Sequence, residues 1–307
     1  MKIHLLKLTC GLALLGAALL PATVSAQIYV ANNGNVGEYN ANTGAQIGSG
    51  PLVSGLSVPS GIAILGNDLY VASGAGSSAV ISEFNATTGV QIGSGPLVSG
   101  LTGQSGIVIS GNNLYVENGG TIGEYNATTG ARIGSGPLIS SGPTDPMGLA
   151  ISGNNLYFVG SSSIYEFNAT TGVQIGSGPL VSGLSIPSGL VASGNDLFLA
   201  SMMGGTITEY NATTGARIGS GPLVSGLISP NGLAISGNDL YVGAGNGTGI
   251  YEFDATTGAQ IGSGPLVSGL SAAAGIVVEP EATPEPSTLA LSVMGGLGSL
   301  LLYRRRK

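Results

Sequence analysis

One short segment recurs six times along the chain and constrains the fold more than any other feature of the sequence. It reads aromatic, Asn or Asp, Ala, any residue, Thr, Gly, and successive copies end 45, 41, 42, 43 and 43 residues apart. The copies end at Gly44, Gly89, Gly130, Gly172, Gly215 and Gly258. Each copy continues into Ile-Gly-Ser-Gly-Pro, as at residues 47–51 and 261–265. A fixed period of this length indicates an array of one repeated supersecondary unit.

The last unit shows how one repeat divides into four short strands. A first apolar strand is expected at 232–235, and Gly237-Asn238 suits the two-residue turn of a hairpin into a second strand at 240–242. A variable Gly/Ser loop precedes a third strand at 250–253. The repeated turn, whose Asn or Asp and final Gly favour local hydrogen bonds and positive φ, then leads to a fourth strand at 259–261. Four strands in about 43 residues is the size of one β-propeller blade.

The phase of the repeat favours a closed ring over an open stack. The repeat region begins with a strand of the second kind, at 27–30, and ends with a strand of the first kind, at 275–278. In a ring the last strand completes the first blade, whereas an open stack would need caps that the sequence does not show. We therefore predict an all-β fold at 27–280: a six-bladed β-propeller of four-stranded blades, closed by the C-terminal strand.

The composition limits the partners of this region. The chain has 55 glycines and no tryptophan, but 43% of its residues are hydrophobic, which fits a turn-rich, packed β protein. Between residues 27 and 280 only Arg132 and Arg217 are cationic, against 13 carboxylates, so the formal charge is 2 − 13 = −11. Such an acidic surface repels phosphate backbones, and we expect no nucleic-acid partner.

The first 26 residues have the parts of a cleavable signal peptide. Lysines precede an apolar core at 11–20, and a small-residue site ends at Ala26, before Gln27. A permanent membrane helix is the alternative, but the apolar run is short and ends at Pro21. Lipid attachment is disfavoured because Cys10 precedes the apolar core. We expect cleavage between Ala26 and Gln27 and export of the chain.

Residues 281–307 carry three signals in order. Pro284, Glu285 and Pro286 come first, then an apolar stretch at 289–303, and finally Arg304, Arg305, Arg306 and Lys307. This tail resembles the PEP-CTERM sorting tail. The resemblance implies recognition by an exosortase-type membrane enzyme, cleavage near the PEP motif, and release to the cell surface or extracellular matrix.

The apolar stretch of the tail is short for a transmembrane helix. The 15 residues from 289 to 303 would span roughly 22 Å as a helix, less than a hydrocarbon core of ~30 Å. The basic cluster would stay cytoplasmic. We expect a short transmembrane helix that inserts transiently into the inner membrane, and a permanent short anchor is the alternative.

The repeat region also resembles the NHL-like and related repeat propellers. The resemblance lies in the aromatic-Asn-x-x-Thr-Gly turn and in strands such as Asn67-Asp68-Leu69-Tyr70-Val71. It implies the propeller fold and carries no activity.

Two polar residue types recur with the repeat. Glutamates occupy the third strand of every copy, at Glu38, Glu83, Glu124, Glu166, Glu209 and Glu252. A carboxylate ring suits Ca²⁺, but six equivalent positions would lie well apart, so we expect local hydrogen bonding and no metal site. Glycan acceptor sequences begin at Asn85, Asn126, Asn168, Asn211 and Asn246. Turn geometry alone explains the repeated asparagine.

No catalytic constellation is visible, so we expect neither an enzyme nor a cofactor. Cys10 and His4 lie in the segment expected to be removed, and the processed body would have no thiol, imidazole or lysine. Gly-Ser-Gly-Pro lacks the lysine and the helix of a phosphate-binding loop. The alternative is a metal-dependent hydrolase resembling the gluconolactonase group, which would recruit residues that break the repeat, such as Glu117 and Asp145.

Three classes of function therefore remain: a structural component of the surface or matrix, a binding module, and a metal-dependent hydrolase. Near-identical copies favour the first, since an active site usually makes one or two blades diverge. Absence of tryptophan weakens sugar binding by stacking. Besides the exosortase, the partners that stay open are an extracellular polysaccharide and another surface protein.

The loop between the second and third strands is the most variable part of the repeat. In the fifth copy it contains Met202 and Met203, two adaptable apolar side chains in a Gly/Ser setting. Such loops should gather around one mouth of the channel, where a rigid scaffold commonly carries recognition. The hypothesis is a binding face centred on 201–205, and the alternative is tolerated loop drift.

Overall fold

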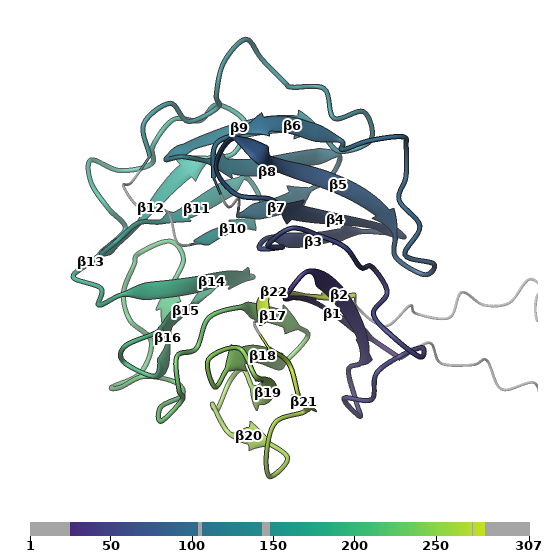
Figure 1. The fold of residues 1–307 in the computed structure, drawn as a ribbon. Coiled ribbons are helices and arrows are strands. Elements are labelled where there is room, and N and C mark those ends of the chain that lie inside the picture. The colour runs from purple at the N-terminus through teal and green to yellow at the C-terminus, as the bar shows by residue number, and fades with distance from the viewer. Residues whose placement is uncertain (1–24, 104–105, 143–147, 272, 280–307) are drawn as a thin grey trace, which may run out of the picture. The chain divides into compact units, whose positions relative to one another are not determined.

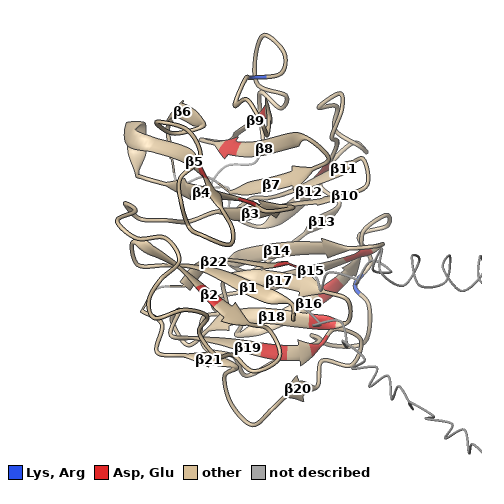
Figure 2. Ribbon diagram, turned by 90° about the vertical axis from the view of Figure 1, so that its right-hand side faces the viewer, with Lys and Arg blue, Asp and Glu red and all other residues tan. Residues whose placement is uncertain are grey.

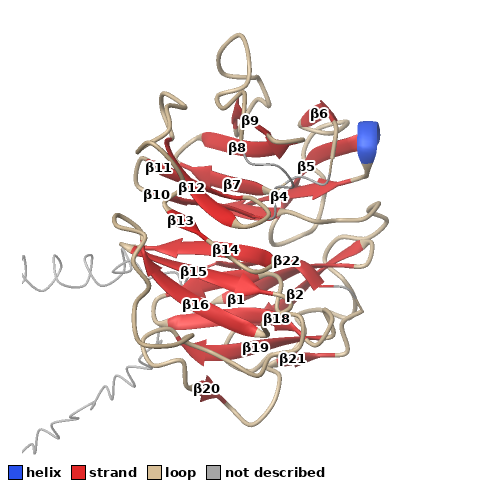
Figure 3. Ribbon diagram, turned by 90° about the vertical axis from the view of Figure 1, so that its left-hand side faces the viewer, coloured by secondary structure: helices blue, strands red, loops and turns tan. Residues whose placement is uncertain are grey.

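The structure, a computed structural model, describes residues 25–103, 106–142, 148–271 and 273–279. Most of the predicted signal peptide, the sorting tail and Asp145 lie outside these ranges. Within them the chain is almost entirely strand and turn, with one short 3-10 helix, η1 (Gly76–Ser78) (Figure 3). No helix of the described ranges is long and apolar enough to cross a membrane, and the predicted transmembrane segment, 289–303, is not among them.

The described strands form six antiparallel sheets, each starting from an innermost strand. The innermost strands are β3 (Ile62–Leu65), β7 (Ile107–Ser110), β10 (Gly148–Ser152), β14 (Pro187–Ser193), β17 (Leu233–Ser236) and β22 (Ala273–Glu279). Each contacts its two neighbours in the order β3, β7, β10, β14, β17, β22 and back to β3. These strands therefore surround a common centre (Figure 1).

The next two strands of each sheet follow in sequence. The second strands are β1 (Gln27–Asn32), β4 (Asp68–Ser73), β8 (Asn113–Asn118), β11 (Asn155–Val159), β15 (Asp196–Ser201) and β18 (Asp239–Ala244). The third strands are β2 (Asn35–Asn40), β5 (Ala79–Asn85), β9 (Thr121–Asn126), β12 (Ser163–Asn168), β16 (Thr206–Asn211) and β19 (Gly249–Asp254). The positions of these strands confirm the predicted strands of the repeat, including those of the last unit, β18 and β19.

The first sheet combines the two ends of the repeat region. β22 pairs antiparallel with β1, from Gln27 opposite Glu279 to Val30 opposite Ile276. Ile276 and Val278 are buried in one cluster with Ile28 and Val30. The pairing that the repeat phase predicts is therefore present between these two strands.

The fourth strand differs from the prediction. It is reduced to short pieces: β6 (Val98–Leu101), β13 (Val181–Ser182), β20 (Gln260–Ile261) and β21 (Val267–Ser268), with single bridges elsewhere. In the last sheet β20 and β21 both pair with β19, and Gly-Ser-Gly-Pro separates them. The first glycine of this segment has φ near +80° in every copy, and proline donates no backbone bond, so the ladder is interrupted there.

The core consists of six apolar clusters, most of which join neighbouring sheets. In one of them Tyr70 and Ala72 of β4 pack with Ile107, Leu114 and Val116 of the next sheet. Second strands such as β4 carry an unbroken run of buried residues because both of their faces are covered.

The repeated turn sets the contact between sheets. Its final glycine has φ between +66° and +69° in all six copies. A Cβ atom on Gly89 would overlap the backbone carbonyl of Leu52 in the preceding sheet, and the other five copies make the equivalent contact. In the first copy this partner is Leu266, from the last repeat. Only glycine fits, because the position needs both positive φ and a close approach.

Candidate functional site

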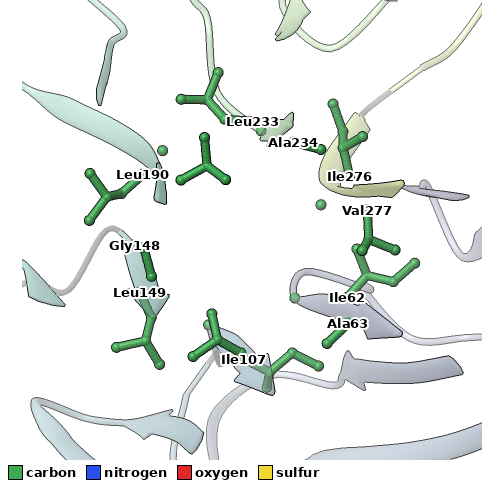
Figure 4. A pocket seen from close by; sticks show the side chains of 18 of the residues that line it. Ile62, Ala63, Ile107, Gly148, Leu149, Leu190, Leu233, Ala234, Ile276 and Val277 are labelled. Atoms are coloured by element: carbon green, nitrogen blue, oxygen red, sulfur yellow. The ribbon is translucent and has the colours of Figure 1, made fainter. Parts of the chain in front are cut away.

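The innermost strands enclose an apolar cavity of about 560 Å³. Aliphatic side chains from all six strands line it, among them Ile62, Ile107, Leu149, Leu190, Leu233 and Ile276 (Figure 4). Each innermost strand pairs on one side only among the described residues. Its other edge brings backbone N–H and C=O groups toward the cavity, and these need water or a ligand as partners. The cavity is therefore mainly apolar in its side chains, with a few polar ones such as Ser60, Ser188 and Asn231, and polar along its strand edges.

Glu117 is the one carboxylate among the described residues that line this cavity. It is the last residue but one of β8, where the equivalent positions of other sheets hold Ala31, Ala72, Val159 and Ala200. The side chain is only 5% exposed, and backbone N–H groups of Gly106 and Gly120 donate to it over 3.5 Å. Burial raises its pKa, and these N–H groups partly offset the shift.

Among the described residues, Glu117 has no partners that would complete a metal site. Within the described ranges no three residues of the types His, Cys, Asp and Glu come together as a metal site would require. A single carboxylate in an apolar channel can accept hydrogen bonds from a ligand or balance one positive charge. Asp145, the other residue considered for catalysis, is not among the described residues.

Apolar side chains are exposed around the end of the channel where the innermost strands begin. We call this set the apolar rim: Val58, Ile186, Met202, Met203 and Ile228. Met202 lines the cavity, and its N–H donates to the carbonyl of Ile186 over 3.1 Å. Met203 is 74% exposed. The predicted loop therefore lies beside the connection that leads into β14, the innermost strand of its own sheet.

The rim also contains strained backbone. Val58 and Ile186, each followed by a proline, have φ values of 45° and 44°. Branched side chains rarely occupy this left-handed region, and such strain clusters at functional sites. This strain is not predictable from the sequence, because residues before proline normally adopt extended backbone.

The recurring glutamates face their own sheets and do not converge. Figure 2 shows the acidic residues distributed over several sheets. In five sheets the glutamate lies opposite a tyrosine of the second strand, as Glu166 does opposite Tyr157. Burial raises the pKa of Glu166, and a hydrogen bond with Tyr157 partly offsets the shift. Glu209 lies opposite Phe198 and is only half-buried.

The predicted signal-cleavage site lies at the start of the folded region. Ala26 is buried, and its carbonyl accepts a hydrogen bond from the N–H of Ala41. Gln27 begins β1. Cleavage between Ala26 and Gln27 would therefore have to precede folding. The sorting residues Pro284, Glu285, Pro286, Arg304, Arg305 and Arg306 are not among the described residues.

Sheets that are built from a repeated sequence unit and arranged around an apolar channel define a repeat β-propeller. A comparison with family models identifies its relatives. The model described as outer membrane protein assembly factor BamB matches residues 11–218, more than half of the chain, so the chain belongs to that family. A PEP-CTERM protein-sorting motif matches residues 282–307. Both predicted resemblances, to a repeat propeller and to a PEP-CTERM protein, are confirmed.

One solved structure supports the fold. A chain from the crystal structure of a nidogen/laminin complex has a TM-score of 0.68 at 15% identity, covering 83% of this chain and 98% of its own. The computationally designed Ika4 protein has a TM-score of 0.42 at 18% identity, covering 54% of this chain and 99% of its own. At such low identity the first likeness shows the fold alone. A search of curated protein sequences finds no match.

Proposed function

We propose that this chain is an exported cell-surface or matrix protein with a six-bladed, closed β-propeller body that binds or supports partners and has no catalytic activity. The pairing of β22 with β1 and the circular order of contacts among innermost strands support closure. Six sheets in the described ranges support the blade number.

The sorting motif supports the destination. A PEP-CTERM motif is a recognition signal for exosortase, and it points to export and association with the surface. We propose that the tail anchors the chain transiently in the inner membrane until it is cleaved near Pro284–Pro286. The acidic body, with two cations between residues 27 and 280, would then be displayed outside the cell.

One observation carries the non-catalytic assignment: the channel is lined by aliphatic side chains and holds a single carboxylate among its described lining residues. Acid–base or nucleophilic catalysis normally requires at least two cooperating groups. The matched family is named for an assembly factor, which supports a binding role.

The apolar rim is the surface that best suits a partner. Its exposed methionines adapt to varied apolar surfaces, and the hydrogen bond from the N–H of Met202 to the carbonyl of Ile186 ties their loop to the neighbouring connection. We propose that an extracellular polysaccharide or a surface protein contacts this end of the body.

The test is to replace Met202 and Met203 by Ser and measure attachment of the protein to matrix and to neighbouring cells. We expect several-fold weaker attachment with a nearly unchanged melting temperature, because Met203 is largely exposed. A matched control replaces Val90 and Val173 by Ser, since these are 65% and 63% exposed on the outer edge of their sheets. Equal attachment of both variants would refute the assignment of the rim.

Glu117 keeps one alternative open, a metal-dependent lactonase-like hydrolase that uses the channel. That function requires a bound metal in the purified protein and lactone hydrolysis that Glu117→Gln abolishes. Finding both would overturn the non-catalytic proposal.

A further inference from the structure

Four of the six repeated turns have the same acceptor sequence for an N-linked glycan. They read Glu, aromatic, Asn, Ala, Thr, with the asparagine at Asn85, Asn126, Asn168 and Asn211. An enzyme that reads this pentapeptide would find four equivalent substrates in one chain.

The turn uses the oxygen of each asparagine. The Oδ1 atom of Asn168 accepts the N–H of Thr170 over 3.0 Å, the N–H of Thr171 over 2.9 Å and the hydroxyl of Thr171 over 3.1 Å. The other three acceptor turns repeat this pattern. Three donors on one oxygen fix the orientation of the amide.

The turn does not use the side-chain nitrogen, Nδ2, of each asparagine. Within the described ranges the Nδ2 atoms of these four residues donate no hydrogen bond, although the side chains are only half-buried. The two threonines that follow each asparagine are exposed, so the surroundings of the amide are open to solvent. A substituent on Nδ2 would therefore break none of the hydrogen bonds that hold the turn.

The sixth copy shows that the turn does not need this nitrogen. Asp254 stands in place of the asparagine, and its Oδ1 atom accepts the same bonds from Thr256 and Thr257 over 2.7–3.1 Å. Turn geometry thus explains the oxygen in every copy. The structure explains the threonine as well, because the hydroxyl of Thr170 donates to Oδ1 of Asn154 just as that of Thr256 donates to Oδ1 of Asn238. What the turn does not explain is why four copies keep an amide whose nitrogen donates no hydrogen bond within the described ranges.

We propose that Asn85, Asn126, Asn168 and Asn211 carry N-linked glycans. A glycosyltransferase would supply an activated sugar diphosphate, whose anomeric carbon is attacked by Nδ2. The Nδ2–C1 bond forms, the C1–O bond to the diphosphate breaks, and the diphosphate leaves with the proton that Nδ2 loses. The proposal needs export but does not depend on the binding role of the rim.

The placement of these residues determines which end of the molecule the glycans would cover. Each turn follows a third strand, at the end of the sheets opposite the apolar rim. The four glycans would cover four consecutive sheets at that end. The rim and the first sheet, where β22 pairs with β1, would stay uncovered.

The experiment is mass spectrometry of the protein purified from the surface of its own host. Cleavage after glutamate places the four asparagines in separate peptides, beginning at residues 84, 125, 167 and 210. We expect a sugar mass in each peptide, placed by fragmentation on Asn85, Asn126, Asn168 and Asn211, because the peptide beginning at residue 210 also contains the acceptor sequence at Asn246. Four peptides with unmodified masses would overturn the proposal.

Matched variants distinguish asparagine from threonine as the attachment site. Asn168→Asp keeps the oxygen of the turn, as Asp254 does, and should remove one sugar mass at an unchanged melting temperature. Thr170→Ser preserves the acceptor sequence and should retain that sugar. A sugar that persists in Asn168→Asp would also overturn the proposal, because it would then be attached elsewhere in the peptide.

Discussion

Replacing Gly89 by alanine should destabilise the protein more than replacing Gly93, a glycine with similar backbone geometry in the same repeat. Their φ angles are 66° and 82°, so alanine at either site must adopt a left-handed conformation, which costs about 1–2 kcal/mol. The sites differ in space. A Cβ atom at Gly89 would overlap the carbonyl of Leu52 in the preceding sheet, whereas one at Gly93 meets nothing within 4 Å.

The difference in stability follows from that overlap. Relieving it requires one sheet to move against another, and overpacking of this kind costs about 1–3 kcal/mol. Gly93→Ala should therefore lower the free energy of unfolding by about 1–2 kcal/mol, and Gly89→Ala by about 2–5 kcal/mol. In a domain of this size, 1 kcal/mol changes the melting temperature by about 2–4 °C. The two variants should differ by roughly 2–12 °C.

Thermal unfolding followed by circular dichroism, with urea unfolding as a second measurement, would test this expectation. Both variants must unfold as one cooperative unit for their free energies of unfolding to be compared. Equal melting temperatures for Gly89→Ala and Gly93→Ala would refute the argument that the repeated turn sets the contact between sheets.

Two further perturbations address closure and charge. Deleting residues 275–279 removes Ile276 and Val278, whose burial contributes roughly 1.5–3 kcal/mol each to stability. The melting temperature should therefore fall markedly, and an unchanged melting temperature would favour an open stack of sheets. Burial raises the pKa of Glu166, so its neutral form is favoured in the folded state and stability should fall as pH rises through the raised pKa. Glu166→Gln should flatten this decline in thermal scans across pH more than Glu209→Gln, whose side chain is less buried.

The sequence was sufficient to predict the second and third strands and the partnership of the first and last strands. Apolar runs such as Leu240–Val242 repeat with one period, and the phase of that period determines which ends must meet. The fourth strand was overestimated, because positive φ at the glycine after each isoleucine is a backbone property that hydrophobic pattern does not report.

The site was predictable only in part. Glu117 and Met202 both break the repeat, which marked them as candidates, but their shared place along one channel depends on how six strands converge. The pairing of Tyr157 with Glu166 was within reach of the sequence, since both positions recur and the hairpin fixes their register. The strain at Val58 and Ile186 was not, because only the assembled connections impose it.

The joint between β1 and β22 has a consequence for how such a gene can change length. The two ends of the repeat region share one sheet, so complete units can be gained or lost between them while the joint stays intact. Recombination between similar copies would change the chain in steps of one unit, about 41–45 residues here. Each added unit would bring one more innermost strand to the centre, and the bore of the channel would widen by a discrete amount.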